Sequence, residues 1–514
     1  MMMSFFILFP LLLSIASPLQ VASHSHEGHH INCGSQKEST IEGIKWITEH
    51  GLIKLGKTHN LNTQGILPTL SSLRYFPEKS VRKYCYTIPV IKGGKYLIRT
   101  SYYYGDFDAG KEPPVFDQII GETKWSVVNT SENYANGLST YYEIITVALR
   151  KKMSVCLARN EFTVGNPFIS TLEFEYLNDS MYNATDFKNY ALATTSRHRF
   201  GLSDGAILRY PDDPVNRYWQ SFADEHPVVE SHTNVSSSYF WNVPPEKAFR
   251  RGLTTSKGKK LTLKWPPTNL ENANYYIALY FQDNRTPSPF SWRIFDVKIN
   301  GENLYTKLNV STAGVMVYSA HRPLSGQVTI TLIPDENSPV GPVINAAEIL
   351  QIVPLGRRTH TRDVNVMEDL ARRLKNVPID WSGDPCMPKE NSWTGVSCSE
   401  GKFARVVSIN LTNFGLDGTL PQSIGKLTAV KSIWLGGNKL HGNIPDMSSL
   451  KHLVSLHLEN NQFNGSIPTS LEKLEKLQEL YLQNNNLRGE LPSNLRNRGG
   501  IKIQYNEQMI DNER

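Results

Sequence analysis

The stretch Leu435-Gly-Gly-Asn438-Lys-Leu440-His-Gly442-Asn-Ile-Pro445 decides how the C-terminal part of the chain folds. It has the form Leu-x-x-Asn-x-Leu-x-Gly-x-x-Pro, and three columns of this pattern recur with steps of 24, 23 and 24 residues. The columns are Leu411, Leu435, Leu458 and Leu482; Gly418, Gly442, Gly465 and Gly489; and Pro421, Pro445, Pro468 and Pro492. Chance does not keep several columns in register, so this region is a tandem repeat.

A period of this length with leucine and asparagine at these positions is typical of leucine-rich repeats. We therefore expect residues 401–500 to form a short solenoid of about four repeats, in which each repeat supplies one strand and its leucines face a continuous core. The asparagine of each repeat should point inward and satisfy backbone groups at the turn. Phe414 takes this position in the first repeat, where we expect it to plug the end of the core.

A cap is expected at residues 381–400, directly before the first repeat. Two tryptophans, Trp381 and Trp393, alternate there with Cys386 and Cys398. A solenoid must cover the open end of its core, and buried indoles with a Cys386–Cys398 disulfide would do so. Residues 355–380 are predicted to form a linker and a short amphipathic helix, because apolar residues recur there at helical spacing. These residues are Val364, Met367, Leu370 and Leu374.

The preceding region has a different pattern. Short aromatic and β-branched runs alternate with Gly, Pro, Asn and Asp turns, as at residues 96–104 and 275–281. This pattern predicts an all-β region, and its length favours two β-sandwiches in tandem, at residues 30–190 and 191–354. The whole chain is therefore predicted to be mainly β.

The first residues predict export. The segment from Met1 to about Ala22 has no charge and contains an apolar run too short to span a membrane, so residues 1–23 are interpreted as a cleaved secretory signal. Residues 501–514 are a polar tail, and no second long apolar run is present, so we expect no membrane span or lipid anchor. Eight Asn-X-Ser/Thr sites are candidates for N-glycosylation: Asn129, Asn178, Asn183, Asn234, Asn284, Asn309, Asn410 and Asn464.

Composition and cysteine usage agree with an exported recognition protein. The net charge of +6 arises from 54 Lys and Arg against 48 Asp and Glu, which is too mild over 514 residues to indicate nucleic acid as a partner. Besides the pair in the cap, Cys85 and Cys156 lie in apolar stretches and are assigned to each other as a disulfide. This leaves Cys33 odd, and three cysteines allow three such choices.

Two stretches of the predicted sandwiches echo each other. Residues 96–108 precede Val115-Phe-Asp-Gln, and residues 275–283 precede Arg293-Ile-Phe-Asp; each reads as a strand, an acidic-polar loop and a strand with Phe-Asp. Further motifs are Ile31-Asn-Cys-Gly, Pro167-Phe-Ile-Ser-Thr-Leu-Glu, Asn345-Ala-Ala-Glu-Ile and Trp381-Ser-Gly-Asp-Pro-Cys. This ordered set resembles the malectin-like family of plants, and the layout resembles the ectodomains of malectin-like leucine-rich-repeat receptor kinases. Because no membrane span or kinase motif is found in this sequence, we expect a free-standing version of such an ectodomain.

The resemblance implies one candidate carbohydrate site. Animal malectin binds a disaccharide through aromatic side chains and an Asp in loops at one end of its sandwich. The matching candidates here are Tyr102, Tyr103, Tyr104, Asp106, Phe107 and Asp108. Aromatic rings stack on sugar C–H faces and carboxylates accept hydroxyl hydrogens. Strand alternation, however, should bury at least one of the three tyrosines, and sandwich packing is the competing interpretation.

The repeats offer a second candidate site. The residue before each core leucine should point outward, which places Asn410, Trp434, His457 and Tyr481 in one column of the concave face. Glu459 and Gln483 flank this column. Stacked exposed rings suit a protein partner, since Trp and Tyr dominate binding hot spots, whereas shielding of the sheet is the structural alternative. A glycan on Asn410 would direct a partner toward repeats two to four.

Catalytic motifs are absent from the sequence. No nucleophile elbow, phosphate loop or metalloprotease helix is present, and Asp106 and Asp108 on one loop do not resemble a glycosidase pair. The histidines His24, His26, His29 and His30 suit a terminal tail better than a metal site. We therefore expect no enzyme activity, cofactor or metal. The favoured function is a secreted recognition module or co-receptor of the apoplast or cell wall that acts with plant receptor kinases. It would bind a receptor-kinase ectodomain or a secreted peptide through the concave face of the repeats, and the alternative is binding of a cell-wall oligosaccharide through the sandwiches.

Overall fold

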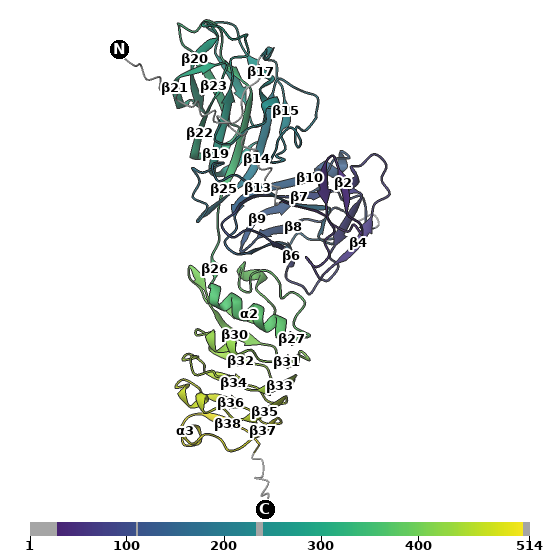
Figure 1. Cartoon of the computed structure of the whole chain (residues 1–514), viewed down its shortest axis with the longest axis vertical. Coiled ribbons are helices and arrows are strands. Elements are labelled where there is room, and N and C mark those ends of the chain that lie inside the picture. The colour runs from purple at the N-terminus through teal and green to yellow at the C-terminus, as the bar shows by residue number, and fades with distance from the viewer. Residues whose placement is uncertain (1–27, 109–111, 233–239, 507–514) are drawn as a thin grey trace, which may run out of the picture.

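The computed structural model describes residues 28–108, 112–232 and 240–506. Its described part is mainly β and is elongated, with the second sandwich at one end, the first sandwich beside it in the middle and the solenoid at the other end (Figure 1). The predicted signal at residues 1–23, the sequon Asn234 and residues 507–514 lie outside the described residues.

One nine-stranded sheet runs through both sandwiches. Its order is β1 (His29–Asn32), β13 (Thr171–Leu177), β7 (Lys95–Tyr102), β10 (Thr140–Val147), β14 (Tyr190–Phe200), β25 (Ala346–Pro354), β19 (Leu270–Phe281) and β22 (Val315–Gly326), with β15 (Gln220–Phe222) beside β14. β14 pairs antiparallel with β10 of the first sandwich and with β25 of the second. The predicted division between residues 190 and 191 falls at the start of β14, so sheet hydrogen bonds join the two sandwiches.

A four-stranded sheet covers each half of this long sheet. The first has the order β6 (Tyr84–Pro89), β11 (Lys152–Arg159), β8 (Phe116–Ile120) and β9 (Thr123–Val128), and the second β18 (Leu261–Lys264), β23 (Thr329–Pro334), β20 (Trp292–Ile299) and β21 (Glu302–Ser311). Alternation sets the inward face: in β20, Phe295, Val297 and Ile299 are buried while the residues between them are partly exposed. They pack against Ile277 and Ile349 of the long sheet.

Short elements complete the sandwiches. They are β2 (Ser39–Ile41) with β3 (Ile44–Trp46); β4 (Lys57–Asn60), β5 (Ser72–Tyr75) and β12 (Phe168–Ile169); β16 (Val228–Glu230), β17 (Arg251–Thr254) and β24 (Val343–Ile344); the helix α1 (Ser131–Ala135); and the 3-10 turns η1 (Pro68–Leu70) and η3 (Glu246–Phe249).

A ladder of alternating charges crosses the long sheet in the interior. Five adjacent strands from β13 to β25 contribute Glu173, Arg99, Glu143, Arg197 and Glu348, and successive N–O distances are 2.8, 2.7, 2.6 and 3.0 Å. Each residue is at most 2% exposed. Burial alone would raise the pKa of Glu143, but the charges of Arg197 and Arg99 outweigh burial and lower it. This charge ladder links the first sandwich to the second.

Both assigned cysteine pairs form disulfides in the structure. Cys85 and Cys156 lie directly opposite each other on β6 and β11, and Cys386 bonds to Cys398. Cys33 takes no part in a disulfide and is fully buried. Burial raises the pKa of its thiol well above the ordinary value, so Cys33 behaves as a small core residue.

The solenoid has two sheets of short strands. The first contains β28 (Val396–Cys398), β30 (Val406–Asn410), β32 (Ser432–Trp434), β34 (Ser455–His457), β36 (Glu479–Tyr481) and β38 (Lys502–Gln504), and the second contains β27 (Leu374–Lys375), β31 (Asp417–Thr419), β33 (Lys439–Asn443), β35 (Gln462–Ser466) and β37 (Asn486–Arg488). β30 to β38 run parallel, as stacked repeats require. Residues 501–504, assigned from the sequence to the polar tail, instead belong to the stack, because Ile501 and Ile503 pack against its core.

The repeat asparagines bind the turns as expected. Asn461, for example, donates through Nδ2 to the carbonyls of Leu435, Leu458 and Glu459 and accepts the N–H of Leu440 through Oδ1. Asn438 and Asn485 make equivalent bonds one repeat away on either side.

The predicted plug at Phe414 is wrong. This side chain is 42% exposed. It does not close the core because Asn438 of the next repeat already bonds the backbone N–H of Leu416 and the carbonyl of Leu411 there.

The cap joins the solenoid to the first sandwich. Trp381 and Trp393 are buried and stacked, with ring centroids 5.0 Å apart. The predicted helix is α2 (Thr361–Arg373), whose apolar face buries Val364, Met367 and Leu370. The remaining elements are β26 (Arg358–Thr359) paired with β29 (Phe403–Ala404), η4 (Lys389–Asn391), η5 (Gln422–Lys426), η6 (Thr469–Lys473) and α3 (Ser493–Arg496). No helix in the described part of the chain combines the length and apolar character that crossing a membrane requires.

Candidate functional site

Three aromatic side chains form a continuous stack on the outward side of β32, β34 and β36. We call this outward surface the repeat face. Trp434, His457 and Tyr481 are register partners at the ends of these strands. The Trp434 and His457 ring centroids are 5.8 Å apart with planes at 27°, and those of His457 and Tyr481 are 4.3 Å apart at 19°. On each strand the preceding residue, Ile433, Leu456 or Leu480, points into the core. The rings therefore point outward and are partly exposed.

Neighbouring polar and charged side chains hold each ring in place. The indole N–H of Trp434 donates to Ser455 Oγ over 2.9 Å, and Nε2 of His457 lies 3.1 Å from Glu479 Oε2. The Lys502 ammonium lies 5.2 Å from the centroid of the Tyr481 ring, which is a favourable cation–π distance. The stack is therefore ordered before any partner binds.

Glu459 and Gln483 flank the stack and retain unused acceptors. The Glu459 carboxylate covers Gly436, where an added Cβ would lie only 2.2 Å from Oε1. Gln483 donates to Gln504 over 2.9 Å. Glu459 Oε2 and Gln483 Oε1 are shielded from solvent and accept no hydrogen bond from the described residues. A rotation of either side chain that exposes this oxygen would let it accept a donor from a bound partner.

Asn410 heads the same column, one strand before Trp434, and is exposed. Its Oδ1 accepts the backbone N–H of Thr412 over 3.3 Å, which leaves its Nδ2 without a hydrogen bond among the described residues. The sequon asparagine is thus accessible at one end of the stack.

Lys502 was missed because the sequence had assigned it to the polar tail. The available signal was Ile503, which follows Leu480 by 23 residues, the same step that separates Ile433 from Leu456. A degenerate final repeat can be found by extending the period past its last full motif.

The tyrosine-rich loop of the first sandwich does not form the predicted sugar platform. Tyr102, Tyr103, Tyr104 and Phe107 are all buried, at 0, 8, 1 and 9% exposed. We expected at least one of the three tyrosines to be buried, and all three are. The chain turns at the end of β7 and packs Tyr104 and Phe107 against Phe168. Their faces are occupied by other rings.

The two carboxylates of this loop are also placed differently from a sugar site. Asp106 is exposed, with a left-handed backbone (φ 54°), whereas Asp108 accepts a hydrogen bond from the Tyr104 hydroxyl. The loop therefore presents one exposed carboxylate and no accessible aromatic face among its predicted residues.

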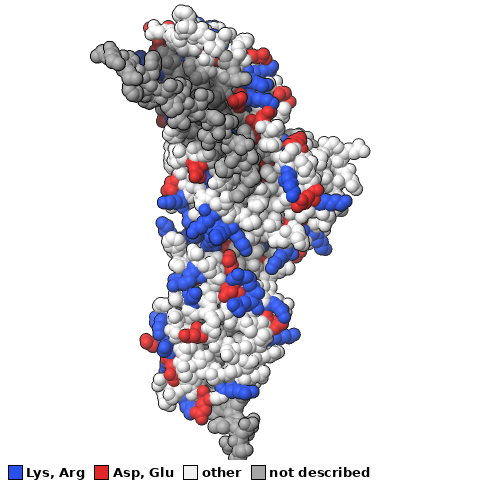
Figure 2. Space-filling view, in the orientation of Figure 1, with Lys and Arg blue, Asp and Glu red and all other residues white. Residues whose placement is uncertain are grey.

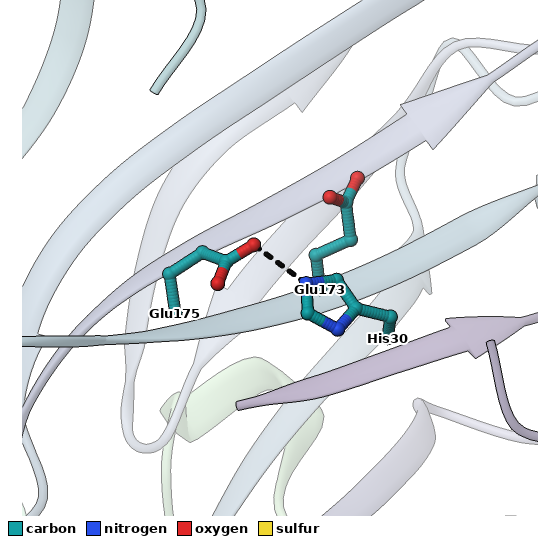
Figure 3. A group of neighbouring side chains, drawn as sticks. All are labelled: His30, Glu173 and Glu175. Atoms are coloured by element: carbon teal, nitrogen blue, oxygen red, sulfur yellow. Dashed lines mark hydrogen bonds and ion pairs between the residues drawn. The ribbon is translucent and has the colours of Figure 1, made fainter. Parts of the chain in front are cut away.

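The expected terminal tail is wrong for His29 and His30, because both lie on β1, which pairs with β13. His30 meets Glu173 and Glu175 of β13 in the interior of the first sandwich (Figure 3). His30 Nε2 lies 2.7 Å from Glu175 Oε1. Burial lowers the pKa of His30, but the hydrogen bond and charge of Glu175 outweigh it, so this pKa is raised. Arg99 pairs with Glu173 at 2.8 Å, and Asn216 donates to both carboxylates. These contacts satisfy the group as the end of the charge ladder, so its geometry favours an ion-pair network over a cation site.

The described sequons differ in accessibility. Six of them have an exposed asparagine: Asn129, Asn178, Asn183, Asn309, Asn410 and Asn464. Asn284 is 7% exposed, its Nδ2 donates to the carbonyl of Glu230, and its Oδ1 accepts from Arg293. Because the glycan would attach to this Nδ2, the folded structure disfavours modification of Asn284.

Comparison with known proteins assigns the family. The malectin-like domain family matches residues 31–352, and the leucine-rich-repeat family matches residues 452–474 and 476–497. A probable leucine-rich-repeat receptor-like serine/threonine-protein kinase of Arabidopsis thaliana is 32% identical over 461 residues, covering 82% of this chain and 47% of the relative. The chain thus spans about half the length of that relative.

Solved structures show the same fold for the sandwich region. The ectodomain of ANX2 from Arabidopsis thaliana aligns with a TM-score of 0.54 at 13% identity and covers 63% of this chain and 97% of its own. A plant complex of the peptide RALF23 with FER and LLG2 contains a chain that aligns with a TM-score of 0.51 at 16% identity, covering 63% and 95%. The chain belongs to the malectin-like family and joins its malectin-like region to leucine-rich repeats, in the layout of receptor-kinase ectodomains.

Proposed function

We propose that this chain is a secreted, non-enzymatic recognition protein of the apoplast or cell wall, which binds a receptor-kinase ectodomain or a secreted peptide through the repeat face. The observation that carries the proposal is the ordered stack of Trp434, His457 and Tyr481. Its rings are partly exposed and are already held by neighbouring polar and charged side chains, so a partner that covers them gains apolar burial at little cost in ordering.

The surroundings of the stack favour a protein or peptide over a purely apolar ligand. Glu459 and Gln483 each keep one unused acceptor, and Lys502 adds a cation at the end of the stack. Backbone N–H groups and polar side chains of a peptide would satisfy these groups around an apolar centre, which is the usual anatomy of a protein interface.

The comparisons support the class of partner. The relatives are receptor-like kinases, and one solved neighbour is a complex of a peptide, RALF23, with FER and LLG2. The surface proposed here rests on this chain's own repeats, which lie outside the sandwich region shared with that neighbour. A glycan on Asn410 would confine the partner to repeats two to four.

The oligosaccharide alternative has less support. Its aromatic candidates Tyr102, Tyr103, Tyr104 and Phe107 are buried in the first sandwich, so a sugar could stack on them only after the loop had refolded. We therefore rank carbohydrate binding second.

The test compares partner capture by the full secreted chain and by the double variant Trp434→Ala/Tyr481→Ala. Both are exposed to an apoplastic extract, and captured proteins are quantified by mass spectrometry. A captured receptor ectodomain or peptide is then purified and titrated against each chain. Loss of two central aromatic contacts is expected to weaken binding at least 30-fold, since each hot-spot truncation costs about 1 kcal/mol or more.

The matched control is Phe290→Ala/Tyr305→Ala in the second sandwich, where the two residues are 74 and 49% exposed. This control should bind like the wild type. Equal binding by all three chains would refute the repeat face as the site. Binding to a plant-glycan array that is unchanged in the Trp434→Ala/Tyr481→Ala chain would favour the oligosaccharide alternative.

A further inference from the structure

A large cleft lies where the first sandwich meets the solenoid cap, and none of the residues discussed for the repeat face lines it. It has a volume of about 1450 Å³. One wall is the outer side of β6 and β11, and the other comprises α2 and the segment from Asn376 to Asp384. The cleft therefore needs both the first sandwich and the solenoid cap of this chain.

Direct contacts fix the two walls relative to each other. The buried Lys83 ammonium donates to the carbonyls of Asp384 and Met387 over 2.5 and 2.9 Å. Gly383 lies against the Cys85–Cys156 disulfide, where an added Cβ would be 2.9 Å from Cys85 Sγ. The cleft is therefore formed before any ligand arrives, which lowers the cost of binding.

Cations dominate the lining. The lining has seven basic side chains and three acidic ones. The basic side chains are Lys54, Lys92, Arg150, Lys151, Lys152, Arg358 and Arg372, and the acidic side chains are Glu122, Glu368 and Asp384. The four lysines are exposed, and none has a carboxylate partner within the described parts of the chain. Figure 2 shows Lys and Arg gathered at the level of β26 and α2, between the sandwiches and the repeats. Such a field attracts an anionic ligand.

Apolar side chains stand among these charges. Ile379 and Phe403 line the cleft and are 59 and 53% exposed. Leu52 and Ile53 add partly exposed aliphatic surface. Large exposed apolar residues beside unpaired cations are typical of an interaction surface. Their chemistry complements a polypeptide with alternating acidic and apolar side chains better than it complements a uniformly polar acidic sugar.

One of the three carboxylates of the lining, Asp384, is buried. Asp384 Oδ2 is buried and accepts no hydrogen bond from the described residues, and the nearest guanidinium nitrogen, of Arg150, is 3.9 Å away. The other oxygen, Oδ1, accepts the backbone N–H groups of Cys386 and Met387, so this carboxylate lies behind the surface that a ligand would contact.

We propose that this junction cleft binds an extended acidic segment of a partner protein, with its carboxylates on the rim lysines Lys92, Lys151 and Lys152 and its apolar side chains on Ile379 and Phe403. The cleft gives the chain a second recognition surface, separate from the repeat face. Binding of the acidic segment weakens as ionic strength rises, because the rim charges are exposed.

The test uses the full chain and a fluorescent synthetic peptide that alternates Asp with Leu and Ser. The comparison probes are the same peptide with Asn in place of Asp, and an oligogalacturonate of similar charge. Anisotropy titrations should show saturable binding of the acidic peptide, at least tenfold tighter than either comparison probe. Lys151→Glu/Lys152→Glu should weaken that binding at least tenfold, and Ile379→Ser by at least threefold.

The matched control is Lys257→Glu/Lys259→Glu, which reverses two exposed lysines of the second sandwich. It should bind the peptide like the wild type, as should Trp434→Ala/Tyr481→Ala, so this result and the test of the repeat face are separable. Equal losses in the two lysine variants would overturn the proposal, because net charge alone would then explain binding. It would also be overturned if the wild type bound the Asn peptide or the oligogalacturonate as tightly as the acidic peptide.

Discussion

Replacement of Arg197 by Met should destabilise both sandwiches, because this residue joins them inside the charge ladder. Its guanidinium contacts Glu143 Oε2 at 2.6 Å and Glu348 Oε2 at 3.0 Å, and all three side chains are at most 1% exposed. Met fills a similar volume but leaves two buried carboxylates without their shared cation.

The size of the effect follows from this geometry. Removal of one partner of a buried ion pair costs about 3–5 kcal/mol. Glu348 keeps hydrogen bonds from the Tyr182 and Tyr280 hydroxyls, at 2.9 and 2.6 Å, and Glu143 keeps Arg99, which places the loss near the middle of that range. At roughly 2 °C per kcal/mol for a large domain, the melting temperature of the sandwich region should fall by about 8 °C.

Calorimetry of the full chain and urea unfolding followed by near-ultraviolet circular dichroism measure this change. The matched control is Arg251→Met, whose exposed pair with Glu230 at 2.7 Å should contribute about 0–1 kcal/mol. The second variant Arg197→Met/Glu348→Gln removes one uncompensated charge and should recover part of the loss. The reasoning is refuted if Arg197→Met and Arg251→Met lower the free energy of unfolding equally.

Three further predictions concern single side chains. Burial lowers the pKa of His198 to about 4, below its unfolded value near 6.5, and its Nδ1 accepts the Trp265 indole N–H. The free energy of unfolding should therefore be intact above pH 6.5 and fall by roughly 3 kcal/mol as the pH drops toward 4. Urea titrations measure this trend, which His198→Gln should flatten. Asn461→Ala removes four internal bonds of the solenoid and should cost about 3 kcal/mol, measured by chemical unfolding against the exposed-site control Asn486→Ala. Glycopeptide mass spectrometry of the chain expressed in plant cells should find Asn284 unmodified, and a glycan there would contradict its buried placement.

The solenoid was the most predictable part of the fold because leucine, glycine and proline recur there at a nearly constant spacing. Leu435, Leu458 and Leu482 occupy the core, and the asparagines bond the turns, as the spacing requires. The plug at Phe414 failed because a periodic pattern gives the position of a residue in the repeat but not whether a neighbouring repeat already satisfies that site.

The sequence predicted two β-sandwiches, but it did not predict that one sheet joins them. Strand patterns identify local periodicity, whereas the pairing of β14 with β10 and β25 is a long-range choice. The charge ladder was invisible for the same reason: Arg99 and Arg197 read as ordinary strand residues until the sheet order places each between two glutamates.

The two candidate sites show the same limit. A column of outward residues follows from strand alternation alone, so Trp434, His457 and Tyr481 were identified together. The loop after β7 has no such periodic constraint, and the burial of Tyr103 and Phe107 depends on rings contributed by distant segments.

The measurement that tests the central claim most directly is site-specific photo-crosslinking in the complex with a captured partner. Benzoylphenylalanine replaces Tyr481 in one chain and Tyr305, on the second sandwich, in another. We predict that irradiation joins the partner to the chain altered at position 481 and leaves the other chain free. Crosslinking only from position 305, or from neither position while the partner remains bound, would contradict recognition through the repeat face.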